Sequence, residues 1–186
     1  MYIGRFVIVA PEFGAYRVSS RSFPDRVVRE SEDVDGLSVV PEEQYDNPYV
    51  SYNCLRKTEN STVIGNGTHV DPIAEKIGMG YPARDALSLA LLSLDFEKDD
   101  YDTPRVAGVV GDDADSYIGI VTKDSLVVEK VEEPTLVATY EEQKPTTLEF
   151  SADDADDAAE KAYGLDYEHP VAACAVYDGE TAIYNG

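Results

Sequence analysis

The chain has 186 residues, of which 37 are acidic and 15 are basic, so its formal net charge is −22. A surface this acidic repels nucleic acid and anionic membranes, and we expect neither as a partner. The length suits one domain spanning residues 1–186, with 43% hydrophobic residues to build its core. The acids are spread between apolar runs, which is typical of a folded protein from an extreme halophile rather than of a disordered tail.

Several other classes of protein are disfavoured by what the sequence lacks. No apolar run approaches membrane-spanning length and no signal peptide precedes the first expected strand, so we expect a cytoplasmic protein. Cys54 and Cys174 do not form a disulfide framework, and we interpret both as small buried apolar residues. His69 and His169 stand alone, and no zinc-binding or P-loop motif is present. We therefore expect no metal and no cofactor.

One stretch departs from the acidic balance: residues 15–29, AYRVSSRSFPDRVVR, hold four arginines and one acid. The guanidinium group offers a planar fork of donors that matches phosphate, and serine adds short neutral donors. Ion pairs with nearby carboxylates are the alternative, which we prefer for Arg26 and Arg29. From the rest of the stretch we predict a set of phosphate ligands: Arg17, Ser20, Arg21 and Ser22.

The first half of the chain alternates between strand and helix signals. Strands are expected at 2–9, 16–18, 49–55 and 61–65, where β-branched and aromatic residues gather, whereas the polar segment 30–44 is interpreted as a surface excursion. Asp71 and Pro72 are typical of a helix N-cap and first helical residue, and glycines follow at 78 and 80. A second helix is expected from Pro82 to about Phe96, with Leu89 and Leu92 widening its buried stripe.

The second half is mostly hairpins. We expect strands at 106–110, 115–121, 125–131 and 135–140, and a final hairpin of 171–177 and 181–184. Between them we expect a helix capped by Ser151, with its aspartates outward and its alanines inward: Ala155, Ala158, Ala159 and Ala162. Contiguous hairpins favour antiparallel sheets. The order of elements therefore predicts an α+β fold, a four-layer αββα sandwich with two sheets face to face and helices outside.

Two polar segments lie between apolar elements. The loop at 97–105, EKDDYDTPR, connects a buried helix to a core strand, so it is held as a rigid platform. Within it, Asp99, Asp100 and Asp102 are interpreted as halophilic surface. At 65–68, the glycines that flank Asn66 permit close approach to a ligand, although an ordinary strand-to-helix connection is the alternative.

Five stretches, in order, resemble the archaeal-type inosine monophosphate (IMP) cyclohydrolase family. They are YIGRF at 2–6, YRVSSRSFPDR at 16–26, PYVSYNCLR at 48–56, GNGTHVDPIAEKI at 65–77 and FEKDDYDTPRVAGVV at 96–110. Beyond these stretches, the later half is similar only in its hairpin pattern. The resemblance implies a fold like that of the N-terminal-nucleophile hydrolases, which agrees with the expected αββα sandwich.

The resemblance also implies a reaction, the last step of purine synthesis. In it, 5-formamidoimidazole-4-carboxamide ribonucleotide (FAICAR) closes its second ring and loses water to give IMP. The carboxamide nitrogen attacks the formyl carbon of the same molecule, so no external nucleophile, metal, ATP or folate is required. An enzyme contributes a phosphate anchor, a clamp on the reactive conformer, a donor for the developing oxyanion and a proton relay. A homo-oligomer, such as a tetramer, is implied as well.

Carried over residue by residue, the resemblance implies three catalytic residues. Arg21 would hold an anionic or carbonyl part of the substrate, Tyr52 would donate or relay a proton, and Glu97 would act as base at the end of a buried helix. The plainer alternatives are a surface ion pair for Arg21 and a core hydrogen bond for Tyr52. The further implied ligands, for base, ribose or substrate charge, are Asn53, Asn66, Lys98 and Arg105.

Two other functions compete with this interpretation. A purine-nucleotide-binding module without catalysis would keep the arginine and serine segment but would not need Tyr52 and Glu97 together. An amide hydrolase of the same fold is disfavoured, because removal of Met1 would expose Tyr2 rather than a Ser, Thr or Cys nucleophile.

Overall fold

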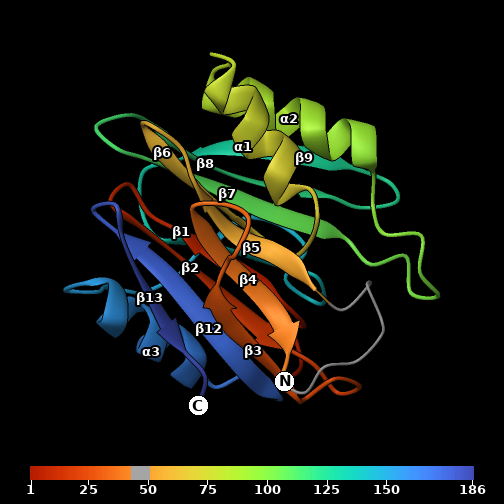
Figure 1. Ribbon diagram of the computed structural model, residues 1–186. Coiled ribbons are helices and arrows are strands. Elements are labelled where there is room, and N and C mark those ends of the chain that lie inside the picture. Colours follow the sequence, from red (N-terminus) through yellow and green to blue (C-terminus); the bar gives the residue numbers. More distant parts are fainter. Residues whose placement is uncertain (43–50) are drawn as a thin grey trace.

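A computed structural model of the chain describes residues 1–42 and 51–186. These residues form two antiparallel sheets and three helices, stacked as helices, sheet, sheet, helix (Figure 1). The predicted four-layer αββα architecture is confirmed, whereas the likeness to N-terminal-nucleophile hydrolases stays a prediction. In the described part of the chain, every helix falls short of the length and apolarity that a membrane crossing requires.

The first sheet has six strands in the order β11-β10-β1-β2-β12-β13. Helix α3 (Ala155–Gly164) covers its outer face with four buried alanines, as predicted, and with its aspartates outward. The strands of this sheet are β1 (Phe6–Val9), β2 (Phe13–Ser19), β10 (Thr135–Ala138), β11 (Thr146–Thr147), β12 (Pro170–Tyr177) and β13 (Glu180–Tyr184).

The second sheet has seven strands, paired in sequence order from β3 to β9. Helices α1 (Val70–Gly78) and α2 (Ala83–Leu94) pack on its outer face against apolar residues of β6, β7 and β8. Its strands are β3 (Arg26–Glu30), β4 (Gly36–Pro41), β5 (Tyr52–Lys57), β6 (Ser61–Gly65), β7 (Arg105–Gly111), β8 (Ser116–Val121) and β9 (Leu126–Val131).

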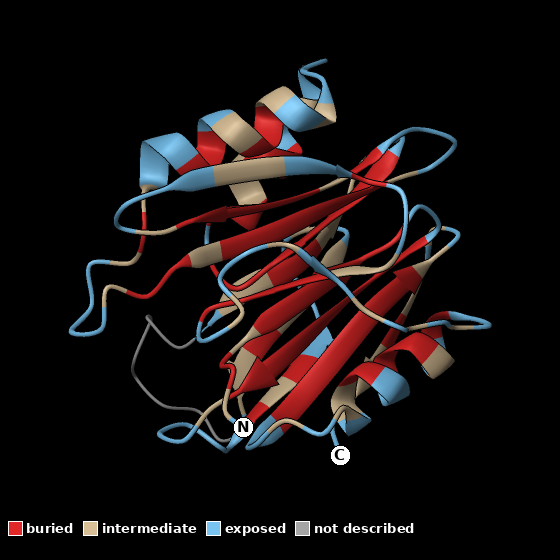
Figure 2. Cartoon of the chain, turned by 180° about the vertical axis from the view of Figure 1, so that it is seen from behind, coloured by how far each residue is buried: buried red, intermediate tan, exposed pale blue. Residues whose placement is uncertain are grey.

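The main core lies between the sheets, where the inner faces of both are buried (Figure 2). Apolar residues alternate along the strands, so each strand sends one row of side chains into this layer. The sheets pack tightly at Gly108, where an added Cβ would lie 2.3 Å from the Cγ2 atom of Val9. Glycine at this position is therefore a packing requirement.

The segment 30–44 differs most from its expected structure. Residues 36–41 form β4, which pairs with β3 and β5 inside the second sheet rather than making a surface excursion. Leu37 and Val39 are buried in the core between the sheets, and they hold the segment in place against its acidic neighbours. Residues 43 and 44 lie outside the described residues.

Strand β1 is shorter than expected, beginning at Phe6 rather than Tyr2. Gly4 has a φ of 74°, and an added Cβ there would lie 2.3 Å from the Oγ1 atom of Thr139. Extended backbone does not accommodate this positive φ, so the chain turns before the strand begins. Residues 2–5 consequently lie at the end of the sheet.

Strand β5 also begins later than expected, at Tyr52, and the expected residues 49 and 50 lie outside the described residues. Its pairing with β4 shifts between Leu37 and Ser38, which leaves Cys54 as an extra residue. This bulge places both Cys54 and Leu55 in the core, although regular alternation would put two consecutive residues on opposite faces.

The helix boundaries and one helix face also differ from expectation. Helix α1 begins at Val70, so Asp71 lies inside its first turn, and α3 is capped by Asp154 rather than by Ser151. Leu89 and Leu92 of α2 are 42% and 65% exposed, because α2 lies on the outside of the sheet and buries only one face.

Candidate active site

A pocket of about 650 Å³ opens between the cationic segment and the loop that follows α2. This volume falls within the range of small-molecule sites. Arg5 precedes β1, Glu97 begins the loop after α2, and Ser20–Ser22 connect β2 to β3. Residues 139–141, which follow β10, line it too. Four segments of the chain that flank strands or helices therefore supply polar side chains to one cavity.

The cationic side of the pocket is open to solvent. Arg21 is more than half exposed, with its guanidinium carbon 4.3 Å from the ring centroid of Tyr2 and an ion pair of 3.5 Å to Glu168. The Oγ atom of Ser20 accepts a hydrogen bond of 2.9 Å from the Phe23 amide, which shapes the turn. Ser22 also lines the pocket. A guanidinium group and two serines thus share one wall.

Arg26 belongs to the same wall, contrary to the expectation of an ion pair. It is only 9% exposed, and its Nε atom donates to the Phe23 carbonyl oxygen over 3.4 Å. Among the residues described here, no carboxylate lies within ion-pair distance of Arg26 or of Arg29. Arg29 lines a separate hollow formed by β3, β4 and β5.

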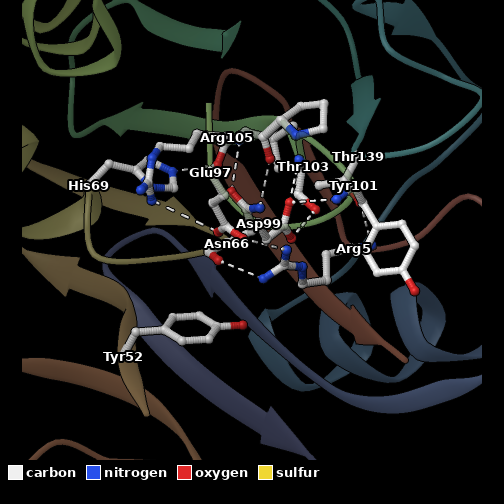
Figure 3. A network of polar contacts seen from close by, with 12 residues as sticks. Arg5, Tyr52, Asn66, His69, Glu97, Asp99, Tyr101, Thr103, Arg105 and Thr139 are labelled. Carbon is white, nitrogen blue, oxygen red and sulfur yellow. Dashed lines mark hydrogen bonds and ion pairs between the residues drawn. The ribbon is translucent and has the colours of Figure 1, made fainter. Parts of the chain in front are cut away.

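The opposite end of the pocket is built on Arg5 (Figure 3). One guanidinium nitrogen donates to the Asn66 carbonyl oxygen at 3.1 Å, and the other lies 3.3 Å from the Oε2 atom of Glu97. Burial by itself would lower the pKa of Arg5, but Tyr52 and Glu97 outweigh burial and raise it. The Arg5 side chain is therefore a fixed positive charge at the inner end of the pocket.

Glu97 lies between two guanidinium groups. Its Oε1 atom is 3.8 Å from the Nη1 atom of Arg105, and its Oε2 atom contacts Arg5. Arg105 is held in turn by donating from Nε to the Asp95 carbonyl oxygen at 2.8 Å. About a quarter of the Glu97 side chain is exposed, so the carboxylate is oriented by charges yet remains accessible.

Tyr52 points toward the Arg5 and Glu97 pair from strand β5 of the second sheet (Figure 3). It lines the hollow formed by β3, β4 and β5 rather than the pocket itself. Its hydroxyl lies 2.7 Å from the hydroxyl of Tyr16. Burial, followed by the neighbouring Tyr52, raises the pKa of Tyr16 well above its ordinary value. Tyr16 thus stays neutral. The hydroxyls of Tyr16 and Tyr52 form one hydrogen bond, which lies close to the positive charge of Arg5.

Comparison with known proteins identifies the family. The model of a family described as IMP cyclohydrolase-like protein matches residues 2–182. The chain belongs to this family. It is 58% identical to an IMP cyclohydrolase of Natronomonas pharaonis and 54% identical to one of Haloarcula marismortui, in each case over 100% of both chains. An IMP cyclohydrolase of Methanocella arvoryzae is 45% identical over 100% of this chain and 99% of the relative.

Within this member of the IMP cyclohydrolase family, Arg17 has a structural role in place of the expected phosphate contact. Its side chain is fully buried and donates to the carbonyl oxygen of Tyr163 in the last turn of α3 at 3.1 Å. It also donates to carbonyl oxygens just after the helix, to Leu165 at 2.8 Å and to Tyr167. The Oγ atom of Ser19 accepts from its Nε atom at 3.1 Å. No donor of Arg17 faces the pocket, because β2 turns this residue toward α3.

Both expected asparagine ligands are engaged elsewhere. The side chain of Asn66 is buried, donating to the Pro104 carbonyl oxygen at 3.0 Å and accepting from the Val106 amide at 2.8 Å. The Asn53 amide donates to Asp71 at 2.9 Å in the hollow beside β5, away from the pocket. Backbone groups therefore occupy the Asn66 side chain, and other side chains occupy that of Asn53.

The two expected cations after α2 have different positions. Lys98 is exposed and pairs with Asp95 at 2.6 Å, and it does not line the pocket. Arg105 lies behind Glu97 rather than in the pocket wall.

Asp99, expected on the surface, lines the pocket and accepts hydrogen bonds from the Thr103 amide and hydroxyl at 2.9 and 2.6 Å. It holds the loop in shape.

Sequence reasoning missed Arg5 as an individual site residue. The signal was a single charge in the otherwise apolar opening IGRFVIVA, because an arginine in such a run needs a buried partner. Cys54 and Cys174 are fully buried as predicted, and burial raises the pKa of the Cys54 thiol well above its ordinary value. A protonated thiol in the core is no nucleophile for an amide hydrolase.

Proposed function

We infer that the chain is an IMP cyclohydrolase, which closes the second purine ring of FAICAR with loss of water to give IMP. The observation that carries this inference is identity of 58% and 54% over whole chains with relatives named IMP cyclohydrolase. The composition of the pocket supports it independently, because a cationic wall and a separate proton-transfer group lie at opposite ends of one cavity.

We place the substrate phosphate at the wall formed by Ser20, Arg21, Ser22 and Arg26. Guanidinium and hydroxyl donors match phosphate oxygens, and this wall is the open end of the pocket. The heterocycle then extends toward Arg5 and Glu97. Such anchoring holds the carboxamide and formamide groups in the reactive conformer, which lowers the entropic part of the barrier.

Ring closure places specific demands on the inner end of the pocket. The carboxamide nitrogen forms a bond to the formyl carbon, and negative charge develops on the formyl oxygen. Arg5 supplies a fixed cation for that oxygen, and the Tyr52 hydroxyl supplies a proton. Glu97 accepts a proton from the attacking nitrogen. The resulting hydroxyl departs as water when a further proton reaches it and the ring nitrogen is deprotonated.

The test is turnover of FAICAR by the purified protein in molar KCl, followed by ultraviolet spectra. We expect conversion to IMP without any added cofactor, and the same rate after treatment with EDTA, because the attacking and accepting groups belong to one substrate molecule. A Glu97→Gln variant is the matched control for contaminating activity.

The competing proposal of a purine-nucleotide-binding module gives a different result. Such a protein binds IMP in calorimetry and has a native circular dichroism spectrum, but it does not consume FAICAR in high salt. That combination would remove the enzyme assignment. We further propose, from the family resemblance alone, a cytoplasmic homo-oligomer such as a tetramer, which sedimentation in molar KCl measures.

A further inference from the structure

His69 is a buried residue that the proposed chemistry does not use. It directly precedes α1, it has no exposed surface, and its Nε2 atom lies 2.9 Å from the carbonyl oxygen of Val106. A carbonyl oxygen only accepts, so Nε2 carries the proton and Nδ1 carries a lone pair. Burial, and to a smaller extent the charge of Arg105, lowers the pKa of His69 to about 3 despite the Val106 contact, so the ring is neutral.

The Nδ1 atom of His69 is buried, and it has no hydrogen-bond partner among the described residues. A buried acceptor without a donor costs free energy, and such groups are commonly satisfied by ordered water. The His69 side chain lies beside those of Glu97 and Arg105 (Figure 3).

Gly67 leaves a space beside these three side chains. A Cβ atom added to this glycine would lie 3.3 Å from the Oε1 atom of Glu97, 3.3 Å from the Nη1 atom of Arg105 and 3.4 Å from the Nδ1 atom of His69. Three polar atoms on three elements therefore converge over one glycine, where no side chain occupies the volume.

The chemistry of these three atoms matches one water molecule. Water donates two hydrogen bonds, which the Nδ1 atom of His69 and the carboxylate of Glu97 accept, and it accepts one from Arg105. The 3.8 Å between Arg105 Nη1 and Glu97 Oε1 exceeds the length of a direct hydrogen bond. A polar contact at that separation is a usual position for a bridging water.

We propose that His69, Glu97 and Arg105 hold one ordered water over Gly67, and that His69 is a positioning residue that fixes the Glu97 carboxylate through this water. Arg5 holds the other carboxylate oxygen at 3.3 Å. Both oxygens of Glu97 are then restrained, and its free edge is oriented toward the pocket. The role of His69 in turnover rests on the proposed function, because it acts through Glu97.

Two substitutions at His69 separate positioning from support of the fold. His69→Asn keeps an acceptor at the place of Nδ1 but loses the donor to Val106, whereas His69→Gln keeps a donor at the place of Nε2 but loses the acceptor. We expect His69→Gln to lower kcat about tenfold with KM nearly unchanged, and His69→Asn to retain more of kcat. A purely structural role predicts the reverse order, because the bond to Val106 would then matter most.

Gly67→Ala tests the water from the opposite side. The new methyl group occupies the point where the three atoms converge, and we expect the same loss of about tenfold in kcat at unchanged KM. Gly78→Ala is the matched control, because an added Cβ there meets nothing within 4 Å. Equal kcat for Gly67→Ala and Gly78→Ala, with both proteins folded, would overturn the proposal.

A crystal structure of the unmodified chain, at a resolution that shows ordered waters, tests the site without reference to turnover. We expect a water within hydrogen-bond distance of His69 Nδ1 and Glu97 Oε1, and its loss in Gly67→Ala. Direct contact of His69 with Glu97 and no water would overturn the proposed site. If the water is present but the unmodified protein does not consume FAICAR, the proposed function has failed and the water site stands.

Discussion

At the scale of single residues, the arginines near the pocket show that position decides the role of a side chain. Arg17 is fully buried and satisfies main-chain carbonyl oxygens, whereas Arg21, four positions later, is more than half exposed beside the pocket. Arg5 combines burial with a carboxylate partner, Glu97. A guanidinium group has five donors, so it serves equally well as a structural brace or as an anion ligand.

The phosphate wall leads to a prediction about affinity. Arg21→Ala removes a charge-assisted contact of about 1.5–3 kcal/mol, so the Kd for IMP should rise at least about tenfold. Arg29→Ala is the control, because Arg29 lies in the separate hollow beside β4 and should leave Kd unchanged. Calorimetric titration in molar KCl measures both. Similar effects from the two substitutions would place the phosphate elsewhere.

The proton relay leads to a prediction about rate. Tyr52→Phe and Glu97→Gln should each lower kcat by about 10²–10⁴-fold, the usual contribution of general acid and base groups, with Kd for IMP nearly unchanged. The double variant should lose much less than the product of the two single losses, because groups that act as a unit are not additive. The kcat values of the four proteins decide this.

Each single variant of the relay also has an informative failure. If Tyr52→Phe retains nearly full kcat, the hydroxyl serves only its contact with Tyr16, and Tyr52 is a core tyrosine. If Glu97→Gln alone is silent, the carboxylate shapes the pocket without transferring a proton. Fully multiplicative losses would show that the two groups act independently.

At the scale of elements, the connections between strands carry the functional groups, and the strands hold those connections rigid. The end of α3 and the chain that follows it show this, since the main-chain carbonyl oxygens at 163, 165 and 167 all accept from Arg17 of β2. Glu168, which pairs with Arg21, comes directly after these residues. One buried arginine thereby fixes a loop that reaches the rim of the pocket.

This brace is open to a stability test. Arg17→Met keeps apolar volume but leaves several buried carbonyl oxygens without donors, so we expect a loss of about 2–4 kcal/mol in the free energy of unfolding. Arg84→Met is the control, because Arg84 is exposed on α2 and its ion-pair partner among the described residues is its neighbour Asp85. Denaturant unfolding in molar KCl measures both. An unchanged midpoint for Arg17→Met would contradict the assigned role.

At the scale of the whole molecule, the net charge of −22 opposes compaction unless salt screens it. Screening acts over roughly 3 Å at 1 M salt, so repulsion between neighbouring surface carboxylates weakens strongly there. The core between the sheets and the two outer helical layers are apolar and close-packed. The acidic side chains therefore lie on the surface, where their mutual repulsion makes the stability of the fold depend on salt.

We therefore predict that Tm rises with KCl concentration up to the molar range, and that dialysis into low salt loosens the fold. The comparison variant carries lysine at Glu129, Glu132 and Glu160, which are exposed and form no ion pair with another described residue. Each reversal makes the net charge two units less negative, so its Tm should depend less on salt. Identical curves for both proteins, or no dependence in either, would exclude surface repulsion as the cause.

Much of the architecture followed from local patterns in the sequence. Alternation and turn residues predicted most strands, and the αββα layering followed from consecutive hairpins, because antiparallel neighbours need only short connections. The sequence also predicted that α3 buries its alanines. The sequence did not predict β3, β4 or the two-residue β11. In β4, acidic flanks concealed the alternation of Leu37 and Val39.

The candidate site divided differently between sequence and structure. The cationic segment and the loop after α2 were identified locally, and both line the pocket. The orientations of Arg17, Arg5 and Asn66 depended on contacts between residues 38 to 148 positions apart. These contacts direct Arg17 away from the pocket, hold Arg5 beside Glu97 and engage Asn66 with the start of β7. A side chain's partners are set by which strands become neighbours, and only the tertiary structure determines that.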